Sequence, residues 1–386
     1  MNAATTILDE QLDRLTNFEP SPFPVISLYL NTQRDGSGRP TFDAFVRKEL
    51  PARAETYTPR SEERESYETD IERIDSFLKT ELDPSTKGLA IFACSGEDLF
   101  ETVQLATPID ENQLFVHNQP HLYTLAKLHD QYPTYAAVIA DTDEAHIFVF
   151  GMRTKLDQQS VEGVKFRRTQ AGGWSQARYQ RHIDEFRDQH VKEMIDELDR
   201  IVTEEKVLHI LFAGDEVLLP LLRDNLPQHL AEKVFDIVKM DVRTPEHEVL
   251  QLTLDAMQKR DAESDAEKAQ RLLNEYRSGG LGVLGVRQTL AALRNGQVDE
   301  LLVSARVEGI EADHEKAVRD MLEKELGVLS EPADQEGDLQ MILSDALVTR
   351  ARQTGAKVTF IEDPELLKKF GGVGALLRYR HAGVIQ

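Results

Sequence analysis

The segment 172–198, GGWSQARYQRHIDEFRDQHVKEMIDEL, joins two adjacent glycines to a long run of helical pattern. Gly172 and Gly173 permit positive φ and leave the backbone without a Cβ, which is typical of a thin loop tip. Apolar residues then recur at near-helical spacing, and Ser175 stands where an N-cap is expected. We therefore predict a glycine loop followed by an amphipathic helix over about 176–204. Its apolar positions are Ile183, Phe186, Val191, Ile195, Leu198 and Ile201.

The residues around this helix predict a sheet. Two short apolar runs, 135–142 and 145–151, flank the turn DTDE and read as a strand pair. After the helix, strands are expected at 207–215 and 234–241, with a helix at 216–226 between them. Alternating strands and helices imply a mostly parallel sheet covered by helices.

The flanking segments predict two further domains. Before residue 130, strand-like runs at 23–32, 88–95 and 99–106 accompany a helical stripe and indicate an α+β domain. After residue 259, helices alternate with strands at 300–305 and 357–362, which indicates a smaller layered α/β/α domain. The expected fold class is thus α/β and α+β, in three domains spanning 1–130, 131–258 and 259–386.

Composition limits the classes of function. The chain has 386 residues, 40% of them hydrophobic, and 68 acidic against 45 basic residues, a formal net charge of −23. Such acidity disfavours general binding to nucleic acid, because attraction to phosphates dominates that binding. The sequence shows no signal peptide and no apolar run of membrane-spanning length, so no membrane partner is expected. With Cys94 as its only cysteine, the chain is expected in the cytoplasm, and no intrachain disulfide can form.

Cofactor and metal motifs give no support for either kind of site. The stretch GLGVLG (280–285) fits a dinucleotide-binding pattern, but a helical segment precedes it where a strand is required. No phosphate-binding P-loop and no H-E-x-x-H pattern occurs. We therefore expect no cofactor and no metal, and we interpret Cys94 as a packed small residue within an apolar strand.

The glycine loop is basic within this acidic chain. From Arg153 to Arg181 there are seven cations against two acids. A helix N-terminus directly behind the tip favours anions such as phosphates, and an indole can stack on a nucleobase. The alternative is an ordinary surface hairpin with Trp174 folded back onto its domain. The residues predicted to bind RNA are Lys165, Arg167, Arg168, Arg178 and Arg181.

At these residues the chain resembles the archaeo-eukaryotic class I peptide-release factors and the Pelota-like rescue factors of the same superfamily. The family's Gly-Gly-Gln loop is matched in order by Gly172, Gly173, Ser175, Arg178, Tyr179 and Arg181. The stretches FPVISLYL and GLAIFACSGEDLFETVQLATPI are similar to the family's first domain. LLNEYRSGGLGVLGVRQTLAALRNGQVDELLVSA and DALVTRARQTGAKVTFIED are similar to its third. The relatives that this pattern points to are the bacterial members.

The resemblance implies a role for each domain. The first would sit toward the decoding site, and the middle domain would reach the peptidyl-transferase centre, against rRNA and peptidyl-tRNA. The third would bind a translational GTPase or the ribosomal stalk base. The first domain lacks Asn-Ile-Lys-Ser, the family's codon-reading motif, so no reading of stop codons is expected.

The second departure from the family leaves two hypotheses open. Trp174 stands where the family has its catalytic glutamine, and indole offers one N–H donor and no acceptor. If the loop bulges by two residues, Gln176 would take the amide role in codon-independent hydrolysis of peptidyl-tRNA on stalled ribosomes. Otherwise Gln176 is a solvated residue of the first helical turn. The chain would then be a non-catalytic hibernation factor that occupies the A site, similar to the bacterial factor Balon. Cleavage of RNA is a third reading, which no acidic or histidine pair in the loop supports.

Overall fold

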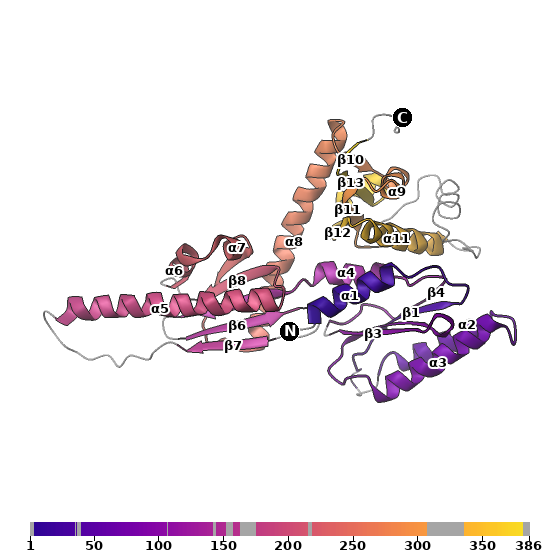
Figure 1. Cartoon of the computed structure of the whole chain (residues 1–386), viewed down its shortest axis with the longest axis horizontal. Helices are drawn as coiled ribbons and strands as arrows, with labels where there is room; N and C mark the ends of the chain where they lie inside the picture. Colours follow the sequence, from indigo (N-terminus) through magenta and orange to yellow (C-terminus); the bar gives the residue numbers. More distant parts are fainter. Residues whose placement is uncertain are drawn as a thin grey trace. The chain divides into compact units, whose positions relative to one another are not determined.

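The chain folds into two compact units that together carry three sheets. The computed structural model describes residues 4–34, 36, 40–105, 107–141, 144–151, 157–162, 175–214, 218–306 and 336–380. One unit comprises Met1–Ile7 and Tyr132–Arg260, and the other Leu8–Gln131 and Asp261–Gln386. The first contains a five-stranded sheet and the second two four-stranded sheets (Figure 1). This mixed α/β architecture confirms the expected fold class.

The N-terminal sheet has the strand order β3-β2-β1-β4, with every pair antiparallel. One of its faces is covered by α2 and α3 through Leu50, Tyr67, Ile74 and Phe77. Ser61 caps α3, since its hydroxyl accepts the N–H of Arg64 at 3.2 Å. The elements are α1 (Ala4–Thr16), β1 (Val25–Asn31), α2 (Asp43–Ala54), α3 (Glu62–Thr80), β2 (Gly88–Cys94), β3 (Leu99–Leu105) and β4 (Gln113–His117).

The five-stranded sheet, of order β7-β6-β5-β8-β9, is mixed. Strands β5, β8 and β9 run parallel, as the alternation of strands and helices predicted, whereas β5, β6 and β7 form an antiparallel meander. Helices α5, α6 and α7 pack on one face, and the first half of α8 packs on the other through Val249 and Met257. The elements are β5 (Tyr135–Ala140), β6 (Glu144–Phe150), β7 (Asp157–Glu162), α5 (Ser175–Glu204), β8 (His209–Gly214), α6 (Leu218–Asn225), α7 (Gln228–Ala231), β9 (Val234–Lys239) and α8 (Glu246–Arg277).

Helix α8 is longer than the sequence analysis anticipated. A charged helix was expected over 261–277, but the helix begins at Glu246 and continues without interruption through the expected boundary at 258/259. The division into three domains stays a prediction.

The C-terminal sheet has the order β10-β13-β11-β12, in which only β11 and β12 are parallel. Helices α9 and α11 cover one face, together with α4 (Tyr123–Gln131) from a distant part of the sequence. Ala269 and Leu272 of α8 cover the other face. The remaining elements are β10 (Gly282–Leu284), α9 (Val286–Arg294), β11 (Val298–Ser304), α11 (Glu336–Gln353), β12 (Lys357–Ile361) and β13 (Val373–Leu377).

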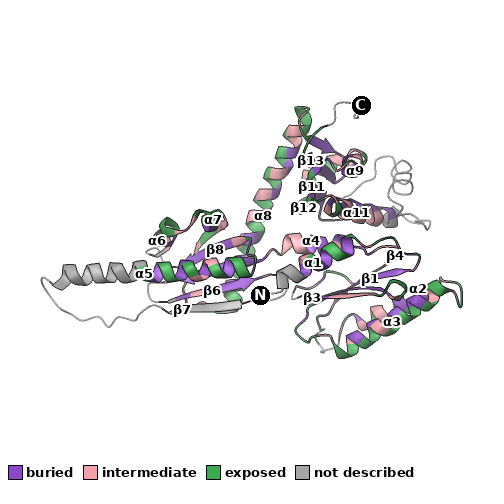
Figure 2. Ribbon diagram, viewed as in Figure 1, coloured by how far each residue is buried: buried purple, intermediate pink, exposed green. Residues whose placement is uncertain are grey.

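Burial follows the alternation expected of covered sheets. Strand β5 is buried throughout and β8 along all but its first residue. Figure 2 shows that α3 is buried on one side and exposed on the other. Strand β9 lies at the edge of its sheet and is mostly exposed or half-buried. These patterns explain why short, uniformly apolar runs such as 135–140 are recognisable as strands.

The close pairing of β5 and β8 leads to a first prediction. Gly214 has φ of +150°, and a Cβ at this position would lie 1.9 Å from the carbonyl oxygen of Ala140. We expect Gly214→Ala to lower the free energy of unfolding by about 2–4 kcal/mol, because both backbone strain and a clash with main chain result. Urea denaturation followed by circular dichroism measures the change.

The control for this prediction is Gly36→Ala. No atom lies within 4 Å of the Cβ that this substitution adds, so stability should change by no more than about 0.5 kcal/mol. Equal stability of the two variants would show that the β5–β8 contact tolerates a side chain.

Candidate functional site

The predicted glycine loop lies between β7 and α5, and both of these elements are attached to the same sheet. Strand β7 pairs with β6 along Asp157–Glu162. The later part of α5 packs into the core of the sheet from Val191 to Val202. Residues 163–174 lie outside the described residues. This range contains the predicted loop residues Lys165, Arg167, Arg168, Gly172, Gly173 and Trp174.

The remaining predicted residues are all on α5. Helix α5 begins at Ser175, which makes Gln176 its second residue and places Arg178 and Arg181 in its first two turns. The first turn of a helix has main-chain N–H groups without intrahelical partners, which favour a negative charge nearby. The positions of these side chains lie outside the described part of the chain, and their roles stay predictions.

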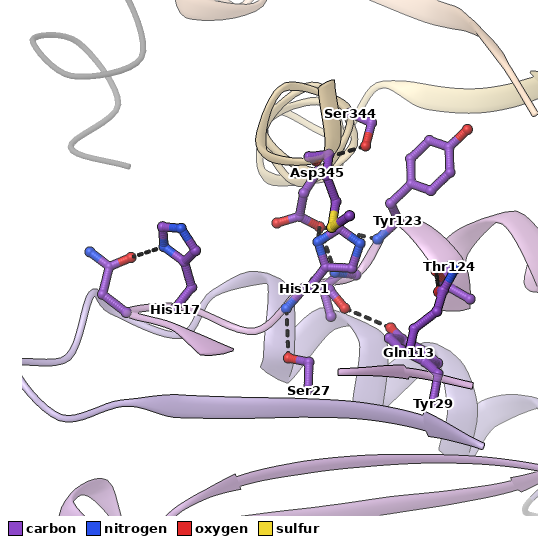
Figure 3. Close-up of polar contacts among 12 residues, drawn as sticks. Ser27, Tyr29, Gln113, His117, His121, Tyr123, Thr124, Ser344 and Asp345 are labelled. Carbon is purple, nitrogen blue, oxygen red and sulfur yellow. Dashed lines mark hydrogen bonds and ion pairs between the residues drawn. The ribbon is translucent and has the colours of Figure 1, made fainter. Parts of the chain in front are cut away.

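A second polar cluster, which the sequence analysis missed, lies at the start of α4. Asp345 of α11 accepts the main-chain N–H groups of Leu122 and Tyr123 through its Oδ1, at 2.5 and 3.1 Å (Figure 3). The His121 N–H donates instead to the Ser27 hydroxyl of β1, at 2.9 Å. The main-chain N–H of His121 thus binds the N-terminal sheet, whereas those of the next two residues, Leu122 and Tyr123, bind α11, which covers the C-terminal sheet.

Aromatic groups complete this junction. The Tyr29 hydroxyl donates to the carbonyl of His121 at 2.6 Å, and the His121 ring lies against Phe115 with ring centroids 3.8 Å apart. On the other side, the Tyr123 hydroxyl donates to the carbonyl of Ser304 at 2.5 Å, and its ring meets Phe360 edge-on. Both tyrosines are buried, so their hydroxyl groups depend on these carbonyl partners.

Burial shifts both ionisable groups of the junction toward their neutral forms. It lowers the pKa of His121 to about 3, with a smaller contribution from His117. It raises the pKa of Asp345 to about 7, although the two main-chain N–H donors oppose that shift. The Nδ1 of His121 lies 3.5 Å from Oδ1 of Asp345. Because the imidazole is neutral at physiological pH, we interpret this contact as a polar contact and not as an ion pair.

The far end of α4 carries a comparable contact. Oδ2 of Asp130 accepts the main-chain N–H of Phe360 in β12 at 2.8 Å. Nearby, Oδ2 of Asp265 in α8 accepts the N–H of Glu362 at 3.1 Å. Burial raises the pKa of each of these two aspartates to about 6. At the start of α4, the carboxylate of Asp345 thus binds main-chain N–H groups of the helix itself. At its end, the carboxylate of Asp130 binds a main-chain N–H of β12.

The described residues give no sign of a metal centre. Within them, no group of three or more His, Cys, Asp or Glu side chains is placed to hold a metal ion. No helix in the part of the chain that the structure describes is long and apolar enough to cross a membrane. Cys94 is buried in β2, 3.8 Å from the Ser21 hydroxyl, as expected of a packed small residue.

Comparison with known proteins shows similarity to translation factors. Residues 120–258 match the model of bacterial archaeo-eukaryotic release factor family 10, and residues 262–381 match the model described as eRF1 domain 3. Over these ranges the chain is similar to the bacterial archaeo-eukaryotic release factors. The resemblance inferred from the glycine loop is thereby confirmed.

Individual relatives match over most of their length. An uncharacterised protein of Mycobacterium tuberculosis is 25% identical over 367 residues, covering 92% of this chain and 93% of that protein. Peptide chain release factor subunit 1 of Methanocaldococcus jannaschii is 26% identical, covering 82% and 85%. Among solved structures, Dom34 of Saccharomyces cerevisiae, a translation termination-like factor, is 12% identical with a TM-score of 0.45, covering 76% and 79%.

The junction around Asp345 leads to a prediction about pH. The folded chain holds the Asp345 proton up to about pH 7, whereas the unfolded chain loses it near 3.8. Stability from this group is therefore lost as pH rises from about 4 to 7. We expect the stability of the wild type, relative to Asp345→Asn, to fall across this window by on the order of 1 kcal/mol per pH unit.

The comparison with Asp345→Asn is needed because the titration of His121 changes the stability of the protein with pH in the opposite direction. Its lowered pKa adds stability as pH rises from about 3 to 6.5. The variant retains His121 and an acceptor oxygen, so the difference between the two proteins isolates the carboxyl group. Urea denaturation at pH 4, 5, 6, 7 and 8 gives the two curves. Parallel curves would contradict the assignment of a raised pKa to Asp345.

Proposed function

We propose that this protein is a ribosome-binding factor that inserts the loop around Gly172–Gln176 into the peptidyl-transferase centre. The family match over residues 120–258, which contain the pair Gly172-Gly173 two residues before the start of α5, is the observation that carries the proposal. The same tip precedes an arginine-bearing helix in the sequence pattern of the release factors. The ribosome, through rRNA and peptidyl-tRNA, is the proposed partner.

The proposed reaction is codon-independent hydrolysis of the peptidyl-tRNA ester, as in the rescue of stalled ribosomes. A water molecule attacks the ester carbonyl, and the bond to the ribose oxygen of the tRNA breaks. The leaving ribose oxygen takes up a proton and becomes the tRNA hydroxyl. A neutral amide serves this reaction by orienting the water, since its task is placement and charge stabilisation. Gln176 is the amide nearest to the glycines on the C-terminal side. The ribosome supplies the remaining positioning.

A non-catalytic function has a specific observation in its favour. The position directly after the glycines, where the family has its glutamine, is Trp174, which has no acceptor for a water hydrogen. Gln176, moreover, is already part of α5. In this second candidate function, Trp174 plugs the centre by stacking on a base, and the factor protects an idle ribosome by occupying the A site.

The C-terminal domain is the proposed site for a second partner. Its match to eRF1 domain 3 covers residues 262–381 and supports a role in binding a translational GTPase or the ribosomal stalk base. Its core is formed by the described residues of β10–β13 and their covering helices.

Release of labelled peptide separates the two candidate functions. With purified ribosomes carrying labelled peptidyl-tRNA, we expect the wild type to release peptide and Gln176→Ala to lower the rate at least tenfold. The matched control is Gln189→Ala on the same helix, where an exposed amide donates to Glu193, and its rate should be unchanged. If the wild type binds these ribosomes without releasing peptide, the hydrolytic function is wrong and the protective one stands.

Binding to ribosomes tests the loop itself. We expect Arg178→Glu to weaken co-sedimentation with ribosomes by at least tenfold at low salt, because it reverses a charge next to the helix N-terminus. Arg223→Glu, at an exposed position of α6 in the same unit, is the control and should bind as the wild type does.

Salt gives an independent measure of the same contact. For single-stranded RNA, the logarithm of affinity should fall against the logarithm of salt concentration by about 0.7 per phosphate contacted. Arg178→Glu should make this slope shallower. Wild-type affinity in Arg178→Glu would argue that the loop does not contact RNA.

A further inference from the structure

The short helix α4 belongs by sequence to the link between the N-terminal sheet and the five-stranded sheet. By packing it is part of the C-terminal domain. Tyr123 and Ala126 are buried in the same hydrophobic core as Val286, Leu343 and Leu347, which lie more than 150 residues further along the chain. A nine-residue helix is too short to be stable by itself in water, so α4 depends on this docking.

Each end of α4 is fixed to the C-terminal domain by a carboxylate. At its start, Oδ1 of Asp345 satisfies two of the main-chain N–H groups that a helix N-terminus leaves without partners. At its end, Asp130 binds the N–H of Phe360 on the free edge of β12. Gln131 also donates to Glu362. Removing any of these acceptors leaves a donor at the junction without its partner.

His121, two residues before α4, is fixed to the N-terminal sheet. The N–H of His121 binds Ser27, and its carbonyl accepts the Tyr29 hydroxyl. Between His121 and Leu122 the chain therefore passes from one domain to the other with no intervening residue. A connection of this length leaves no slack for independent movement while both sets of bonds hold.

A second set of contacts joins the same two domains near the end of α11. Arg352 pairs with Asp13 of α1 at 3.2 Å, and the Gln353 amide donates to the carbonyl of Thr16 at 2.9 Å. Asp13 is exposed, so this ion pair contributes less than the partly buried contacts of Asp345. Helix α1 also meets α4, where Asp9 lies 3.0 Å from Nε2 of His129.

We propose that α4 couples the N-terminal sheet to the C-terminal domain, so that the two move and unfold as one body. The carboxylate of Asp345 holds α4 in place for this coupling. An event at either domain, such as the binding of a partner, would then be transmitted to the other through residues 121–131. The proposal does not depend on the chemistry of the glycine loop.

Native-state hydrogen exchange of the full-length protein in low urea tests the coupling through α4. In the wild type, peptides from β1 and β2 and peptides from β11 and β13 should open with the same free energy and the same urea dependence. In Asp345→Ala, exchange over 121–131 should become at least tenfold faster, and the two groups of peptides should separate in their opening free energy. Asp345→Asn, which keeps an acceptor oxygen, should resemble the wild type.

Two results would overturn the proposal. One is independent opening of the two sheets in the wild-type protein. The other is an exchange rate over 121–131 in Asp345→Ala that stays within about twofold of the wild type. If Asp345→Ala does not fold, Tyr123→Phe replaces it, since this change removes only the hydroxyl that binds Ser304. The same separation of the two sheets is expected, and its absence overturns the proposal.

Discussion

One carboxylate oxygen of Asp345 binds two consecutive main-chain N–H groups, and the arrangement of the larger unit depends on that contact. Hydrophobic packing alone attracts α4 to the C-terminal sheet, but it is not directional. The carboxylate adds direction, because it accepts only where the helix presents its unpaired donors. Burial of the group costs free energy, as its raised pKa shows, so the contact is tolerated for what it specifies and not for a large gain in stability.

The five-stranded sheet anchors the two elements that flank residues 163–174. Helix α5 has 30 residues, and among its described side chains those from Val191 to Val202 pack on the sheet. The strand that leads into the segment, β7, is held along its whole length by β6. The elements on either side of residues 163–174 are therefore attached to one sheet.

The sequence predicted those elements whose pattern is local. Strands β1, β2, β5, β6 and β8 are apolar runs, and the helical spacing of α5 continues over several turns. Helix α4 and strand β4 were not anticipated, since each is short and its burial depends on partners far along the chain. The early start of α8 was not anticipated, although Val249, Thr253 and Met257 are spaced by four.

The functional residues, too, were only partly predictable from the sequence. The loop residues were recognised because their order along the chain matches a family, and the resemblance to that family is confirmed. The contact of Asp345 with Leu122 spans 223 residues, and no spacing rule connects the two. A single sequence contains no signal for such a pair. Only the folded chain shows that an aspartate in an otherwise ordinary helix has a partner in the N-terminal half.

The carboxylates of Asp130 and Asp265 have a consequence for the solution behaviour of the chain. Strand β12 lies at an edge of its sheet, where unpaired N–H groups can recruit a strand from another molecule. The main-chain N–H of Phe360 in β12 is already bound by Asp130 of α4, and that of Glu362, directly after the strand, by Asp265 of α8. Fewer donors are therefore left at this edge for a second chain to pair with. The bond between Asp130 and Phe360, which holds the end of α4, thus also protects this sheet against edge-to-edge aggregation.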